Sequence, residues 1–217
     1  MPSRLAALVR KDLETEARRK TSLWVQAGFT LAASVLVASA ASGAQSPEET
    51  AAAGMILVSL FLSLYASLSS FLKEAYRGTL DGLRAAPVER WLVASAKLVV
   101  SFILILAELL LFSLVLAAFS PVRPAWPALL SWIGGTSLFL ASVASFVSAG
   151  MAFAEESSGP LAMILLVLSI PYLRSAHAPL SLSLGGTYPE PGSLAALWGM
   201  AAVFGLLVIG LTSLVLE

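Results

Sequence analysis

The sequence predicts an all-α, polytopic membrane protein with six transmembrane helices and an N-terminal amphipathic helix at the membrane surface. Of its 217 residues, 58% are hydrophobic and only 12% are charged, compared with roughly 25% charged residues in soluble domains. The apolar residues gather in runs, most of which reach the roughly 20 residues that a helix needs to cross a bilayer. We therefore expect one transmembrane domain over residues 1–217.

The first twenty residues predict an amphipathic helix that precedes the first span. Apolar residues recur there at every fourth position, at Leu5, Val9, Leu13 and Ala17. This spacing places them on one side of a helix whose remaining surface is charged. Such a helix suits the headgroup plane, with its apolar side dipped into the acyl boundary. The alternative is a basic anchor whose helicity has no role.

The spans follow in order along the chain, five of them long and one short. The long runs cover residues 22–41, 51–72, 91–119, 126–153 and 193–216. The run at 91–119 exceeds the bilayer thickness, so we expect it to tilt or to extend into the cytoplasm. The short run starts at Pro160 and reaches Arg174 after fourteen residues. Because Pro171 removes a backbone donor, we expect an irregular or re-entrant segment over residues 172–179.

The distribution of basic residues predicts which side of the membrane each loop faces. The N-terminal segment carries six Lys and Arg residues, and the segment 73–90 carries four. The segments after the first, third and fifth spans carry none, one and one. Because Lys and Arg are enriched on cytoplasmic loops, we expect both termini in the cytoplasm and an outer segment over residues 174–192.

The loop between the second and third spans, residues 73–90, is too polar to lie in hydrocarbon. Leu80 and Leu83 form a small apolar face, and Pro87 ends any helix there. A helix of two turns buries too little surface to be stable alone. Two interpretations remain open, a helix that docks against a partner and a solvated connecting loop.

Two groups of residues carry a resemblance to known families. The first group follows the second span: Glu74, Gly78, Thr79, Leu80, Leu83, Pro87 and Lys97. It resembles the signature of export-type ABC transporter permeases of the ABC-2 class, in which this loop is the coupling helix that fits a cleft in a separate ATP-binding subunit. The second group opens the chain: Lys11, Asp12, Leu13, Glu16 and Arg18. It is similar to the start of the haem exporter B family, CcmB, the permease of the cytochrome c maturation system, as are the chain length and the Ile170–Pro171 pair.

The resemblance implies a mechanical role in a larger complex of the cell inner membrane. No Gly-x-x-x-x-Gly-Lys-Ser/Thr phosphate loop occurs in the sequence, so ATP is expected on a CcmA-like partner. A second copy of the chain and CcmC-like and CcmD-like haem-handling subunits are further implied partners. Nucleic acid is not expected, because the thirteen basic and thirteen acidic residues cancel. The implied coupling residues are Glu74, Arg77, Gly78, Thr79, Leu80, Leu83, Arg84 and Pro87, of which Leu80 and Leu83 form the docking face.

Two isolated polar residues are the remaining functional candidates. Glu108 lies among apolar residues of the third span, where a carboxylate costs about 2.5 to 3.5 kcal/mol on insertion scales. It either belongs to a conducting or partner-facing surface or is a protonated acid bonded to a neighbouring helix. His177 is the single histidine, and a lone histidine in an outer segment is more often an exposed loop residue than a haem ligand. The sequence therefore predicts no catalytic residue and no metal site, and leaves open whether haem binds in the complex.

Other functional classes fit the residues less well than an ABC permease half. A stand-alone secondary carrier would use Glu108 as its coupling charge. Such carriers commonly have paired interrupted spans, whereas only the fifth span is expected to be interrupted here. An intramembrane enzyme would need a cluster of polar residues at one depth, and Glu108 stands alone in its span. An ABC-2 exporter for another substrate remains the nearest alternative.

Overall fold

Seven α-helices and no strand make up the residues that the computed structural model describes, which are residues 2–18, 20–69, 78, 89–154 and 159–215. The helices are α1 (Pro2–Ala17), α2 (Lys20–Ser42), α3 (Pro47–Ser69), α6 (Arg90–Phe119), α7 (Trp126–Ala154), α8 (Gly159–Leu184) and α9 (Pro191–Val215). All except α1 are long and apolar enough to cross a membrane. The all-α fold class and the six spans are therefore confirmed.

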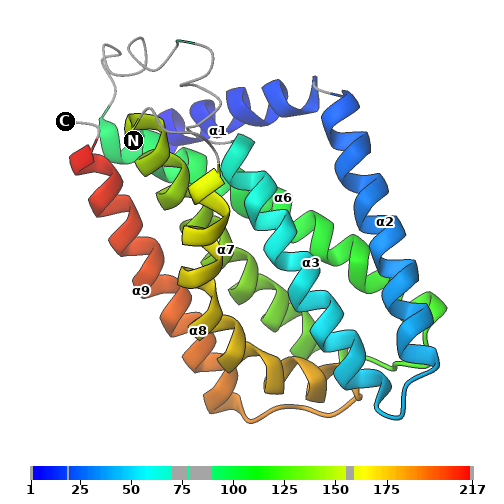
Figure 1. Ribbon diagram of the computed structural model, residues 1–217. Helices are drawn as coiled ribbons and strands as arrows, with labels where there is room; N and C mark the ends of the chain where they lie inside the picture. Colours follow the sequence, from blue (N-terminus) through cyan, green and yellow to red (C-terminus); the bar gives the residue numbers. More distant parts are fainter. Residues whose placement is uncertain (1, 19, 70–77, 79–88, 155–158, 216–217) are drawn as a thin grey trace.

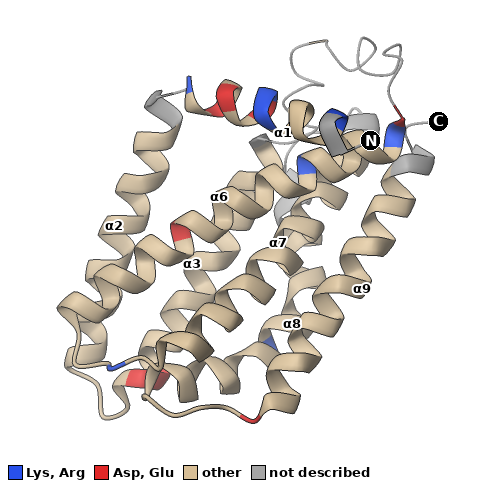
Figure 2. Cartoon of the chain, turned by 180° about the vertical axis from the view of Figure 1, so that it is seen from behind, with Lys and Arg blue, Asp and Glu red and all other residues tan. Residues whose placement is uncertain are grey.

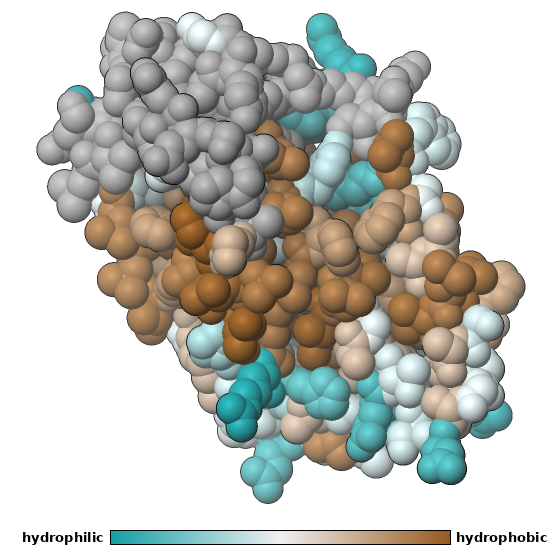
Figure 3. Space-filling view, viewed as in Figure 1, coloured by the Kyte–Doolittle hydropathy of each residue, from teal (hydrophilic) through white to brown (hydrophobic). Residues whose placement is uncertain are grey.

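The six spans lie side by side in one bundle, and α1 lies across one end of it (Figure 1). The start of α6 and the last described turn of α9 are at this same end. Charged residues gather toward the two ends of the bundle and are sparse between them (Figure 2). Figure 3 shows a broad hydrophobic band across the middle of one face, with hydrophilic side chains toward the end opposite α1. This distribution is the one expected of a bundle that spans hydrocarbon.

Helix α7 forms the centre of the bundle. Within its apolar stretch 78% of the residues are buried, compared with 22% in α2 and in α9. Its closest neighbour is α9, and adjacent glycines allow that approach. A Cβ atom on Gly134 would lie 2.8 Å from the ring of Trp198 on α9, and the Trp198 indole donates a 3.1 Å hydrogen bond to Ser131 Oγ. Small residues of this kind let membrane helices pack closely.

Buried serines line α3 at helical spacing. Ser59, Ser63 and Ser67 are fully buried, and each donates to the backbone carbonyl three residues earlier, at 2.7 to 2.8 Å. The hydroxyls are thus satisfied within their own helix. Their small volume suits close packing against neighbouring helices more than it suits a solvated path.

Helix α8 is continuous from Gly159 to Leu184, so the expected irregular segment at 172–179 is wrong. It includes both Pro171 and Pro179. Prolines are tolerated in membrane helices where neighbouring groups satisfy the freed backbone atoms. Pro179 frees the carbonyl of Ser175, four residues earlier. On the same turn, the indole of Trp132 on α7 donates a 2.8 Å hydrogen bond to the carbonyl of Ala176. Figure 1 shows α8 bending, with its last turns running across the end of the bundle toward the start of α3.

Two further expectations for this region are corrected. The predicted outer segment 174–192 is helical in its first half, and only residues 185–190 connect α8 to α9. His177 accordingly lies within α8 and not in a loop. The prediction ended the span at Arg174, but the buried side of the helix continues through Ala176, Leu180 and Leu184, which are at most 1% exposed.

Candidate coupling junction and intramembrane polar site

The predicted coupling residues fall almost entirely outside the described residues. This applies to Glu74, Arg77, Thr79, Leu80, Leu83, Arg84 and Pro87. Gly78 is described, and its φ of 66° lies in the left-handed region that favours glycine. The preceding helix ends at Ser69 and the next begins at Arg90. Both of these ends lie at the end of the bundle that α1 crosses (Figure 1).

Helices α1 and α6 are joined at this end by an ion pair between Asp12 and Lys97; we call these two residues and the nearby Glu16 the α1–α6 junction. Lys97 Nζ lies 3.1 Å from Asp12 Oδ2, and the two side chains are 9% and 16% exposed. Glu16, one turn along α1, is buried as well. A buried charge is tolerated when it is paired. The junction therefore ties α1 to the second turn of α6, the helix that follows the predicted coupling loop.

The buried side of α1 differs from the predicted apolar stripe. Leu5, Val9 and Leu13 are half-buried, so part of the side predicted to dip into the acyl boundary packs on the bundle, and Ala17 is exposed. Asp12 and Glu16 complete the protein-facing side instead. The helix packs on the bundle through a polar contact as well as an apolar one, so α1 is part of the folded permease domain and more than a lipid-facing anchor.

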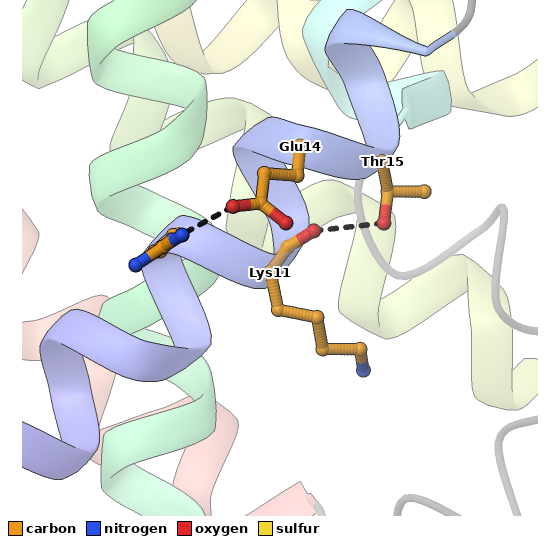
Figure 4. Close-up of polar contacts among 4 residues, drawn as sticks. Lys11, Glu14 and Thr15 are labelled. Atoms are coloured by element: carbon orange, nitrogen blue, oxygen red, sulfur yellow. Dashed lines mark hydrogen bonds and ion pairs between the residues drawn. The ribbon is translucent and has the colours of Figure 1, made fainter.

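The opposite side of α1 carries an exposed ion pair. Arg10 Nε donates to Glu14 Oε1 at 2.7 Å, and Thr15 Oγ1 donates to the Lys11 carbonyl at 2.8 Å; both contacts are drawn in Figure 4. The hydrogen bond from Arg10 lowers the pKa of the Glu14 carboxyl below its ordinary value. Exposed pairs of this kind add little to stability. The pair therefore serves as a natural control for the buried one.

Glu108 lies at the contact between α2 and α6 and is half-buried. The Thr30 side chain of α2 lies beside its carboxyl, and Thr30 is fully buried. Gln26, one turn earlier on α2, is 4% exposed. Glu108 Oε2, Thr30 Oγ1 and Gln26 Oε1 have no hydrogen-bond partner among the residues that the structure describes. Glu108 therefore faces a neighbouring helix, which fits either of the two roles expected for it.

Sequence reasoning missed the pairing at the α1–α6 junction and the two α2 residues beside Glu108. A signal for the first was present, because Lys97 lies seven residues inside a span and a cation there needs a counter-charge. Gln26 and Thr30 could be suspected only as polar residues four apart on an otherwise apolar span.

His177 is half-exposed on α8. Across the described part of the chain, no group of three or more His, Asp or Glu residues is arranged to hold a metal ion.

Comparison with known proteins gives one family match. Residues 3–171 match the model of the family described as ABC-2 type transporter. The match runs from α1 into α8, so it includes the α1–α6 junction and Glu108. No curated protein matches the chain.

Proposed function

Because this chain belongs to the ABC-2 type transporter family, and is thereby the membrane permease subunit of an ABC transporter that pairs with an ATP-binding subunit, we propose that its transporter serves cytochrome c maturation. In this proposal the ATPase is CcmA-like and the permease functions as a pair of copies. The complex either exports haem or uses ATP to release a haem-loaded chaperone from CcmC-like and CcmD-like subunits.

The proposed route from ATP to the membrane begins at the loop 73–90. We propose that Leu80 and Leu83 dock in a cleft of the ATPase, with Arg77 and Arg84 at the rim. A displacement of this loop reaches α6 directly, because α6 begins at Arg90. The observation that carries the proposal is the α1–α6 junction, since the Asp12–Lys97 pair makes α1 follow the same movement.

The cytochrome c assignment is supported by the residues that open the chain. Asp12 and Glu16 belong to the group that resembles the haem exporter B family, and both face the bundle at the α1–α6 junction. The resemblance therefore includes residues with a structural task and not only exposed charges. Glu108, beside Thr30, is the proposed intramembrane residue that responds to the movement.

Complementation tests this function. The chain and a CcmA-like ATPase are expressed in a bacterium that lacks its own cytochrome c maturation permease, and covalently bound haem in c-type cytochromes is measured. Recovery is expected with the native chain and with Arg10→Ala, which breaks only the exposed pair. A strong reduction in bound haem is expected with Lys97→Ala. If the ATPase co-purifies and hydrolyses ATP but no cytochrome c matures, the transporter serves another substrate. If no ATPase co-purifies, the secondary-carrier interpretation is favoured.

A further inference from the structure

Arg174 is an exposed cation within a helix that spans the membrane. It lies in the apolar stretch Met163–Leu184 of α8 and forms no ion pair with any residue that the structure describes. Charged residues within spans almost always meet an opposite charge or water. Helix α8 continues past Arg174 to Leu184, and its last turns run across the end of the bundle opposite α1 (Figure 1). With no acidic partner among the described residues, Arg174 is met either by water or by an anionic group from outside this protomer.

A groove of about 520 Å³ opens between α8 and α9, and Arg174 adjoins it on α8 without lining it; we call it the α8–α9 groove. Its floor is aromatic, because Phe139 of α7 stacks on Tyr172 with ring centroids 3.9 Å apart and planes 5° apart. Pro171 and Ser175, which flank Arg174 along α8, both line it. Gly199 lines the α9 side, where an added Cβ would meet no atom within 4 Å. The groove is open toward the membrane rather than closed within the protein.

The polar and apolar parts of the groove are ordered along the membrane normal. Ser175 and Arg174 lie at the end nearer the membrane surface, while Leu168 precedes them by about two turns toward the bilayer centre. On α9, Val203 and Leu207 lie 12 and 16 residues after Pro191, which is roughly 18 to 24 Å along the helix. The cationic group is thus outermost and the apolar lining lies deeper. A phospholipid has the same order, with its phosphate at the surface and its acyl chains toward the centre.

We propose that the α8–α9 groove binds an acyl chain of an anionic phospholipid from the leaflet at this end of the bundle, with the lipid phosphate on Arg174. Guanidinium groups bind phosphate oxygens in a bidentate manner. A second copy of this chain is a poorer occupant, because among the described residues it offers carboxylates at this end only at the starts of α3 and α9, at Glu48, Glu49 and Glu190. A phospholipid supplies both the phosphate and the acyl chain.

Lipid binding to the purified full-length permease tests this proposal. Native mass spectrometry counts bound phospholipid as phosphatidylglycerol or phosphatidylcholine is titrated into lipid-depleted protein. Arg174→Gln is expected to weaken phosphatidylglycerol binding about fivefold, as estimated from the attraction of one basic residue to an anionic surface. Binding of phosphatidylcholine is expected to stay unchanged. Arg174→Lys keeps the charge and is expected to keep most of the preference.

A second pair of variants tests the groove separately from the charge. Gly199→Phe adds a ring on the side of α9 that lines the groove, where the Cβ atom would meet no other atom within 4 Å, and is expected to reduce binding of both lipids. Gly210→Phe is the matched control, because it lies on α9 outside the groove and a Cβ there also meets no atom within 4 Å.

Several results would overturn the proposal. Equal binding of the two lipids by the native chain, or an unchanged preference in Arg174→Gln, would remove Arg174 as the phosphate ligand. Equal losses in Gly199→Phe and Gly210→Phe would remove the groove. If Gly199→Phe instead separates a dimer while lipid counts stay constant, the groove is an interface between copies. If added iron protoporphyrin binds and depends on Arg174 whereas phospholipid does not, it is a cargo site.

Discussion

Removal of one partner of the Asp12–Lys97 pair is expected to release α1 from α6. The two atoms are 3.1 Å apart and both side chains are largely buried. Breaking a buried ion pair by removing one partner costs about 3 to 5 kcal/mol. Since Asp12 retains 16% of its side-chain exposure, we expect the lower end, about 3 kcal/mol, which corresponds to roughly two decades in the ratio of docked to undocked α1.

The two single variants are expected to differ. Lys97→Ala leaves the buried carboxylates of Asp12 and Glu16 on the same side of α1 without this cation, so we expect a larger loss than for Asp12→Ala. Replacement of both partners by leucine removes the uncompensated charge, and such apolar replacements are often neutral or stabilising. The double variant is therefore expected to recover docking. Arg10→Ala, which breaks only the exposed pair, is expected to have little effect.

The position of α1 can be measured directly. The chain contains no cysteine, so two cysteines introduced at exposed positions of α1 and α9 can carry nitroxide labels without competition. Pulsed electron spin resonance then gives the distance distribution between the helices. A broad distribution in Lys97→Ala and a narrow one in the native chain are expected. Narrow distributions in both single variants would show that the pair does not hold α1 and would refute the reasoning.

The remaining predictions concern the loop, the intramembrane acid and the helix packing. Leu83→Asp is expected to abolish co-purification of the ATPase while the permease remains inserted and dimeric, with a milder effect for Arg84→Ala; a normal complex would reduce the loop to a connection between spans. Glu108→Gln is expected to keep insertion and thermal stability but to lower ATP-driven activity, and unchanged activity would leave only a structural role. Gly54→Ala is expected to destabilise α2–α3 packing by about 1 to 3 kcal/mol in a thermal unfolding assay, because a Cβ there would lie 2.6 Å from Val37; failure of Val37→Ala to restore stability would contradict this cause.

The spans were predictable because hydrocarbon imposes a requirement on consecutive residues. A helix must be apolar over most of its length to cross, and this can be read from the sequence without knowledge of neighbours. The same reasoning failed at α8, because it ended the span at the first charge. Arg174 lies on the outward side of that helix, and the side that packs inward stays apolar beyond it through Leu180 and Leu184.

The site was less predictable, because it depends on contacts between distant segments. Asp12 and Lys97 could each be noted in the sequence, but their pairing depends on how α1 crosses the bundle. The neighbourhood of Glu108 likewise depends on which side of α2 turns toward α6. The family resemblance predicts a coupling loop over residues 73–90, but the position of such a loop against an ATPase belongs to a complex of two chains.

The contact between α7 and α9 has a consequence for how the protein is made. Helix α7 places Ser131 and Ser142 against α9, since the Trp198 indole donates to Ser131 Oγ and a Cβ on Gly205 would lie 3.2 Å from Ser142 Oγ. Trp198 also covers Gly134 and Gly135 of α7. That cover belongs to α9, which is synthesised after α7. A nascent chain that has inserted α7 but not yet α9 therefore exposes polar groups and backbone to lipid, and is the stage at which membrane quality control is expected to recognise it. Stalling translation before and after α9, with turnover of each product measured, would locate that stage.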